Sequence, residues 1–168
     1  MKPLALILIS LNLAACQTFN LDFLKPKEEA SVEERIPDDP KLAQLYQKMK
    51  ANSARMKAEN PHSKQSHKTI ISELRPGEQA DVEIELDAGK PYTLFANCTD
   101  SCFDLDLALT HSANLSKTLA ADTSGDTPAP VLRHTPTQSG KHRASIIMAS
   151  CRAPSCQYSL QIFESPAK

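Results

Sequence analysis

Apolar and polar residues alternate along most of the chain beyond residue 67. The clearest alternation places Ala80, Val82, Ile84 and Leu86 between acidic residues. A period of two is typical of a β-strand with one buried and one solvated face. The same reasoning predicts strands at residues 68–74, 80–86, 92–98, 104–109, 117–121, 131–135, 143–150 and 156–163.

The number and order of these segments predict the architecture. About eight short strands separated by turn signals are typical of a β-sandwich or barrel. No helical pattern lies between consecutive strands, and parallel strands would need such long crossovers. We therefore expect a mainly β, antiparallel fold.

A helical pattern precedes the strands, over residues 41–60. Asp39 is expected to cap its first amides, and Pro40 suits the first helical position. Apolar residues at spacings of three and four give one weakly apolar side, and several lysines make the rest basic. Two interpretations stay open: the apolar side packs on the chain's own domain, or the helix lies on anionic lipid or docks to a partner.

The first residues form a different pattern. Lys2 is followed by an apolar run from Leu4 to Leu13, too short for a membrane-spanning helix and typical of a removable secretory leader. The run ends in Leu-Ala-Ala-Cys at residues 13–16, which resembles the lipobox of bacterial lipoproteins. This resemblance implies that residues 1–15 are a signal peptide and that Cys16 carries diacylglycerol and an acylated amino group.

Residues 16–40 are polar and interrupted by prolines. Such a segment buries too little apolar surface to fold, so we interpret it as a flexible tether to the lipid. Its root-mean-square reach is roughly 25–30 Å. Gln17 stands where an Asp would resemble an inner-membrane retention signal, and this favours the outer membrane.

Composition limits the choice of function. The net charge is −1 and becomes −2 when Lys2 is removed with the leader. A near-neutral chain lacks the basic footprint of a nucleic-acid-binding protein. Tryptophan is absent and aromatic residues make up 5% of the chain, so the core is expected to be aliphatic.

The cysteine count agrees with an exported protein. Five cysteines less Cys16 leave an even set, and beyond the inner membrane such thiols form disulfides. Four cysteines allow three connectivities. We favour the two local pairs because each encloses a short loop, and a tetrahedral zinc site is the alternative. The favoured pairs are Cys98 with Cys102 and Cys151 with Cys156.

Six short segments carry a second resemblance. They occur in a fixed order at residues 74–78, 98–102, 104–107, 122–128, 136–141 and 151–158. This series is similar to bacterial pre-peptidase C-terminal (PPC-like) domains. The resemblance implies an antiparallel jelly-roll-like β-sandwich over residues 67–164. It also implies a module that accompanies secreted peptidases or stands alone, with relatives that bind calcium or extracellular polymers.

Four acidic residues are candidate ligands for a calcium ion. Calcium prefers six to eight oxygen ligands, and carboxylates supply them. Residues two apart on a strand share a face, and a nearby loop supplies the other two carboxylates. The alternative is a set of solvated side chains. The four residues are Asp104, Asp106, Asp122 and Asp126.

The sequence offers little support for an enzyme. No Gly-x-Ser-x-Gly or His-Glu-x-x-His motif is present, and the five histidines are scattered. His134 and His142 are expected to be neighbours across a hairpin, with Asp126 nearby.

We expect a non-catalytic module, lipid-anchored in the bacterial envelope, that recognises a protein or glycan through disulfide-stapled loops around 98–106 and 151–156. The alternatives are an accessory lipoprotein of an envelope machine that docks through its basic helix, or a small inhibitor of envelope hydrolases. No cofactor is expected beyond the candidate calcium.

Overall fold

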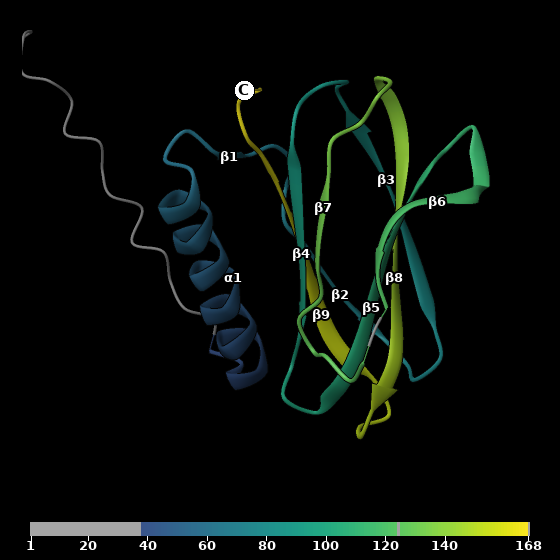
Figure 1. Cartoon of the computed structure of the whole chain (residues 1–168). Coiled ribbons are helices and arrows are strands. Elements are labelled where there is room, and N and C mark those ends of the chain that lie inside the picture. The colour runs from purple at the N-terminus through teal and green to yellow at the C-terminus, as the bar shows by residue number, and fades with distance from the viewer. Residues whose placement is uncertain (1–37, 124, 168) are drawn as a thin grey trace, which may run out of the picture. The chain divides into compact units, whose positions relative to one another are not determined.

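The computed structural model describes residues 38–123 and 125–167 (Figure 1). The predicted signal peptide, the lipidation residue Cys16 and the tether before Asp38 lie outside these residues. The described part contains α1 (Pro40–Glu59) and nine strands. The strands are β1 (Lys64–Gln65), β2 (Ile70–Leu74), β3 (Gln79–Leu86), β4 (Tyr92–Cys98), β5 (Cys102–His111), β6 (Asn114–Asp122), β7 (Val131–His134), β8 (Gly140–Cys151) and β9 (Cys156–Glu164).

The structure confirms all eight predicted strands, with shifted ends. The additional strand, β1, has two residues and falls in a polar segment where no alternation could reveal it. The helix covers residues 40–59 rather than 41–60. Its cap is the predicted one, because Asp39 Oδ1 accepts hydrogen bonds from the amides of Lys41 (2.8 Å) and Leu42 (3.4 Å).

The strands form two antiparallel sheets. Sheet A has the order β1-β9-β4-β7, and β2 pairs with β9 as well. Sheet B has the order β3-β8-β5-β6. The chain passes repeatedly from one sheet to the other, and β2-β9-β4-β7 facing β3-β8-β5-β6 is the order of a jelly roll. The predicted mainly β sandwich is therefore confirmed.

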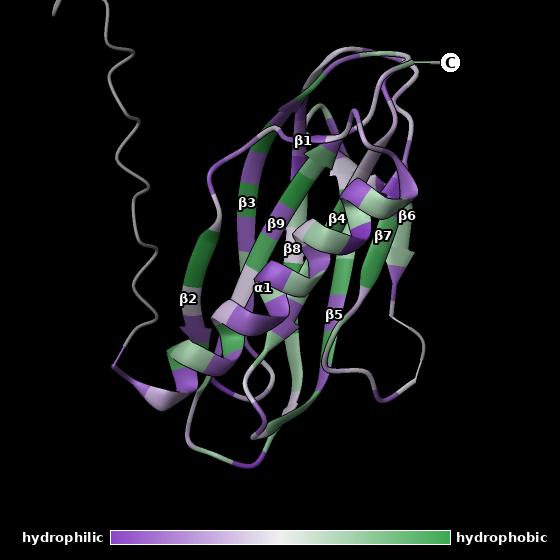
Figure 2. Ribbon diagram, turned by 90° about the vertical axis from the view of Figure 1, so that its left-hand side faces the viewer, coloured by the Kyte–Doolittle hydropathy of each residue, from purple (hydrophilic) through white to green (hydrophobic). Residues whose placement is uncertain are grey.

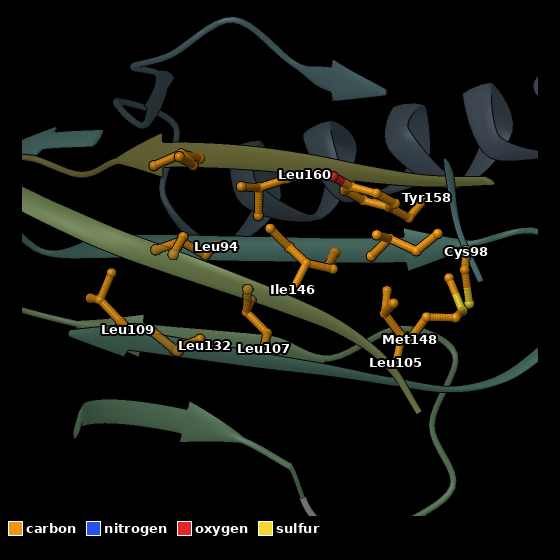
Figure 3. Close-up of a cluster of buried hydrophobic side chains, with 14 of the residues drawn as sticks. Leu94, Cys98, Leu105, Leu107, Leu109, Leu132, Ile146, Met148, Tyr158 and Leu160 are labelled. Atoms are coloured by element: carbon orange, nitrogen blue, oxygen red, sulfur yellow. The ribbon is translucent and has the colours of Figure 1, made fainter. Parts of the chain in front are cut away.

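The core lies between the sheets and is aliphatic, as expected. Leu94 and Leu160 from sheet A face Leu107 and Ile146 from sheet B, and all four are at most 1% exposed (Figure 3). Along β5, buried leucines alternate with more accessible aspartates, so the period-two pattern correctly predicted which face is inside.

The helix covers the outer face of sheet A, against β9 and β4 (Figure 2). Leu45, Met49 and Met56 are its buried residues, and Met56 packs with Phe95 and Phe163. Because α1 covers one side and sheet B the other, every residue of β4 is buried. Of the two interpretations of the helix, packing on its own domain is the one that the structure shows. No helix among the described residues is long and apolar enough to cross a membrane.

Candidate binding site

Both predicted disulfides are present, and they lie at one end of the sandwich. Cys98 ends β4 in sheet A and is bonded to Cys102, which begins β5 in sheet B. Cys151 ends β8 in sheet B and is bonded to Cys156, which begins β9 in sheet A. Each disulfide therefore closes a passage from one sheet to the other. The zinc alternative is excluded, because all four sulfur atoms are in disulfide bonds.

The two closed loops, residues 98–102 and 151–156, are also neighbours. Cys102 and Cys151 are register partners on adjacent strands. The amide of Arg152 donates to the carbonyl of Ser101 at 2.8 Å, which joins one loop to the other. The amide of Thr99 donates to the carbonyl of Gln157 at 3.0 Å. We call these loops and the pocket beside them the disulfide end.

A pocket of about 650 Å³ opens at the disulfide end. One wall is an aromatic and cationic pair: the Arg152 guanidinium carbon lies 3.6 Å from the centroid of the Phe103 ring. A guanidinium at this distance is attracted by the face of the ring and gives a flat, partly apolar surface with polar edges. The lining residues are Lys48, Asp100, Cys102, Phe103, Asp126, Pro128, Ser150 and Arg152.

The helix contributes one side chain, that of Lys48, to this pocket. Lys48 Nζ donates hydrogen bonds to the carbonyl of Cys98 at 2.8 Å and to Asp100 Oδ1 at 3.0 Å. These bonds fix the lysine against the first disulfide loop. The sequence identified Lys48 only as part of a basic helix, since nothing local shows that residues 50 positions apart meet. The pocket lining thus carries both charges: Lys48 and Arg152 are positive, and Asp100 and Asp126 are negative.

The geometry does not support the predicted calcium site. Asp122 pairs with Leu107, so it lies on the face of sheet B opposite to Asp106, and its Oδ2 accepts from the Val131 amide at 2.8 Å. Asp126 lies in the lining of the disulfide-end pocket instead. Within residues 38–123 and 125–167, no group of three or more His, Cys, Asp or Glu side chains is arranged to hold a metal ion.

Asp104 and Asp106 remain as an acidic pair on the outer face of β5. Burial raises the pKa of Asp106 above its ordinary value, and the negative charges of Asp104 and Asp122 raise it further. Asp104 Oδ1 is buried with no hydrogen-bond partner in the described part of the chain. The charges of Asp104 and Asp122 thus repel that of Asp106, but the three carboxylates do not come together around a position where a cation could bind.

The histidine prediction is correct in one half and wrong in the other. His134 and His142 are neighbours, with ring centroids 6.4 Å apart, but β7 belongs to sheet A and β8 to sheet B, so they face each other between the sheets and not across a hairpin. Asp126 is not beside them, because it lies at the disulfide end. The sequence missed a third member, His111, which pairs with His142 across β5 and β8.

Two facing sheets in jelly-roll order place the chain among the β-sandwich domains. Among solved structures, it is similar to the pre-peptidase C-terminal domain of collagenase from Bacillus anthracis, with 14% identity and a TM-score of 0.43. The alignment covers 56% of this chain and 87% of that chain. No family model matches the chain, and no curated protein matches it. The fold class therefore rests on the strand order itself.

Proposed function

We propose that the protein is a non-catalytic binding module, held in the bacterial envelope by a lipid on Cys16, that recognises a protein or glycan at its disulfide end. The lipobox-like leader and the polar segment after it support the anchor. The PPC-like sequence motifs support a module that recognises other molecules. The observation that carries the proposal is the pocket that two disulfide-closed loops build together.

The chemistry of this pocket suits a polar partner with an apolar patch. The stacked Phe103 and Arg152 offer a flat surface for a sugar ring or an aromatic side chain. The charged groups around them offer a partner both kinds of hydrogen bond. Lys48 is a donor, and Asp100 and Asp126 are acceptors. Loops that are already closed lose less conformational entropy on binding, and this increases affinity.

Docking through the helix is less favoured. The buried residues Leu45, Met49 and Met56 of α1 already face sheet A, and the apolar side is therefore not free for a partner. The exposed residues of α1 are mostly polar or small, with Lys41, Lys50 and Lys57 among them, which is typical of a solvated helix face.

The proposal is tested by affinity purification with the full chain as bait, from detergent-solubilised envelope. A double variant, Phe103→Ala with Arg152→Ala, removes the stacked pair. Leu115→Ala is the matched control, because Leu115 is also a large exposed side chain but lies on β6, outside the pocket. We expect wild type and the control to capture the same partner in equal amounts. The double variant is expected to capture at least about tenfold less of it.

The same samples test the anchor and the metal. The mass of the purified bait is expected to show acylation at Cys16, and a calcium chelator is expected to leave capture unchanged. Equal capture by the double variant would contradict recognition at the disulfide end. An unmodified amino terminus would contradict the lipid anchor.

A further inference from the structure

Three histidines from three strands gather at the end of the sandwich opposite to the disulfides. His111 ends β5, His134 ends β7 and His142 lies near the start of β8. The ring of His142 is 4.9 Å from that of His111 and 6.4 Å from that of His134, measured between centroids. We call this cluster and the pocket beside it the histidine end.

The pocket at the histidine end has a volume of about 550 Å³. This is within the usual range for small-molecule sites, roughly 300–1,000 Å³. Besides the three histidines, its lining includes Lys117 of β6 and the amide side chains of Asn114 and Gln138. No carboxylate belongs to the described lining, so Lys117 supplies a positive charge that no acidic neighbour in the pocket offsets.

The hydrogen bonds of two histidines define what each ring can offer. His142 is 1% exposed, and its Nδ1 lies 2.9 Å from the carbonyl oxygen of Gly140. A carbonyl only accepts, so Nδ1 carries the proton, and Nε2 is the ring nitrogen left for a ligand. His111 Nδ1 accepts from the amide of Ala113 at 3.2 Å, and in the neutral ring its Nε2 is therefore a donor.

The surroundings of His134 oppose a positive charge on its ring. Burial lowers the pKa of His134, and the neighbouring His142 lowers it further. Lys117 from β6 also lines the pocket. Tyr92 lies opposite His134 on β4; its pKa is raised by burial, and its hydroxyl lies 3.5 Å from Glu164 Oε2 of β9. On β3, the register partner of His142 is Ile84, which is apolar. A ligand with a negative charge would supply the compensation that the lining of this pocket lacks.

We propose that the histidine end binds a small anionic ligand, one that carries a carboxylate or phosphate group, and that His134 takes up a proton as it binds. Lys117 attracts the anion at the mouth of the pocket. Protonated His134 then donates a hydrogen bond to it from inside. This site is separate from the disulfide end, because β5 and β8 run their whole length between the two.

The test is an NMR titration of the full chain that follows the ring signals of the three histidines. The probes are glucuronate and inorganic phosphate, with glucose as the uncharged match for glucuronate. We expect the anions to shift these signals and glucose to leave them unchanged. The affinity for glucuronate is expected to be at least about tenfold higher at about pH 5.5 than at about pH 7.5, because binding adds a proton.

Two lysine variants provide the matched comparison. Lys117→Gln removes a charge that lines the pocket. Lys141→Gln removes a charge outside the pocket, because Lys141, next to His142 in the sequence, pairs its Nζ with Glu83 Oε1 at 2.7 Å. We expect the first to weaken glucuronate binding by about three- to tenfold and the second to leave it unchanged. His134→Gln is expected to reduce the dependence of affinity on pH.

Four results would overturn the proposal. They are equal shifts with glucose and glucuronate, an affinity that does not change with pH, equal losses in the two lysine variants, and ring signals that respond to Zn²⁺ but to neither anion. The last would identify the cluster as a metal site.

Discussion

The two ends of the sandwich are made from the same strands but are held together differently. At the disulfide end, covalent bonds join β4 to β5 and β8 to β9. At the histidine end, hydrogen bonds between turns hold the neighbouring segments, for example from the Gly89 amide to the Pro136 carbonyl at 2.8 Å. One end should therefore respond to reductant, and the other to pH. The same aliphatic core therefore connects one end that is closed by disulfide bonds to another whose turns are held by hydrogen bonds.

The largest expected effect is from removing a disulfide. Replacing Cys98 and Cys102 together with alanine should lower the free energy of unfolding by about 2 kcal/mol, because the unfolded chain regains the freedom of the closed loop. The same holds for Cys151 and Cys156. Urea unfolding in oxidising and reducing buffer measures both.

Reductant provides the control for this prediction. It should destabilise the wild type and have no effect on a variant that lacks all four cysteines. If the wild type unfolds at the same urea concentration in both buffers, the covalent ties contribute nothing to the disulfide end.

A smaller effect is expected from acid, and it should come from the histidine end. The pKa of His134 is lowered in the folded protein, so below about pH 6.5 the unfolded chain binds its proton more readily. The stability contributed by neutral His134 is complete above this pH and is lost as the pH falls through the range between the unfolded and the folded pKa. Thermal unfolding against pH measures the loss, which His134→Gln should reduce and Lys141→Gln should not. An unchanged profile in His134→Gln would contradict the assignment.

The sequence predicted the parts of the fold that depend on local pattern. Alternation identified strands such as β3, β5 and β8 because one face of each is buried. The loop lengths favoured the disulfide pairs that the structure contains. The sequence could not identify β1, whose two polar residues pair with the end of β9 and show no apolar alternation. The sequence also could not predict that β4 is buried on both faces, because the helix that covers its outer face lies far from it in the sequence.

The sites were less predictable, because they depend on register. Asp104, Asp106 and Asp122 are close along the chain, yet the pairing of Asp122 with Leu107 separates their faces. Conversely, His111 and His142 are distant in sequence and become register partners. Lys48 reaches the disulfide loop only because α1 packs across sheet A. Spacing along one strand predicts a face, but the pairing of strands decides which side chains meet.

Hydrogen exchange of backbone amides, with and without reductant, tests most directly whether the disulfide bonds hold the loops of the disulfide end. The amides of Thr99 and Arg152 report on the disulfide end, and those of Gly89 and Ser112, all hydrogen-bonded to backbone carbonyls, report on the other. We predict that reductant reduces the protection of the first two by at least about tenfold and leaves the second two unchanged. Equal loss at both ends, or no loss at Thr99 and Arg152, would contradict the account.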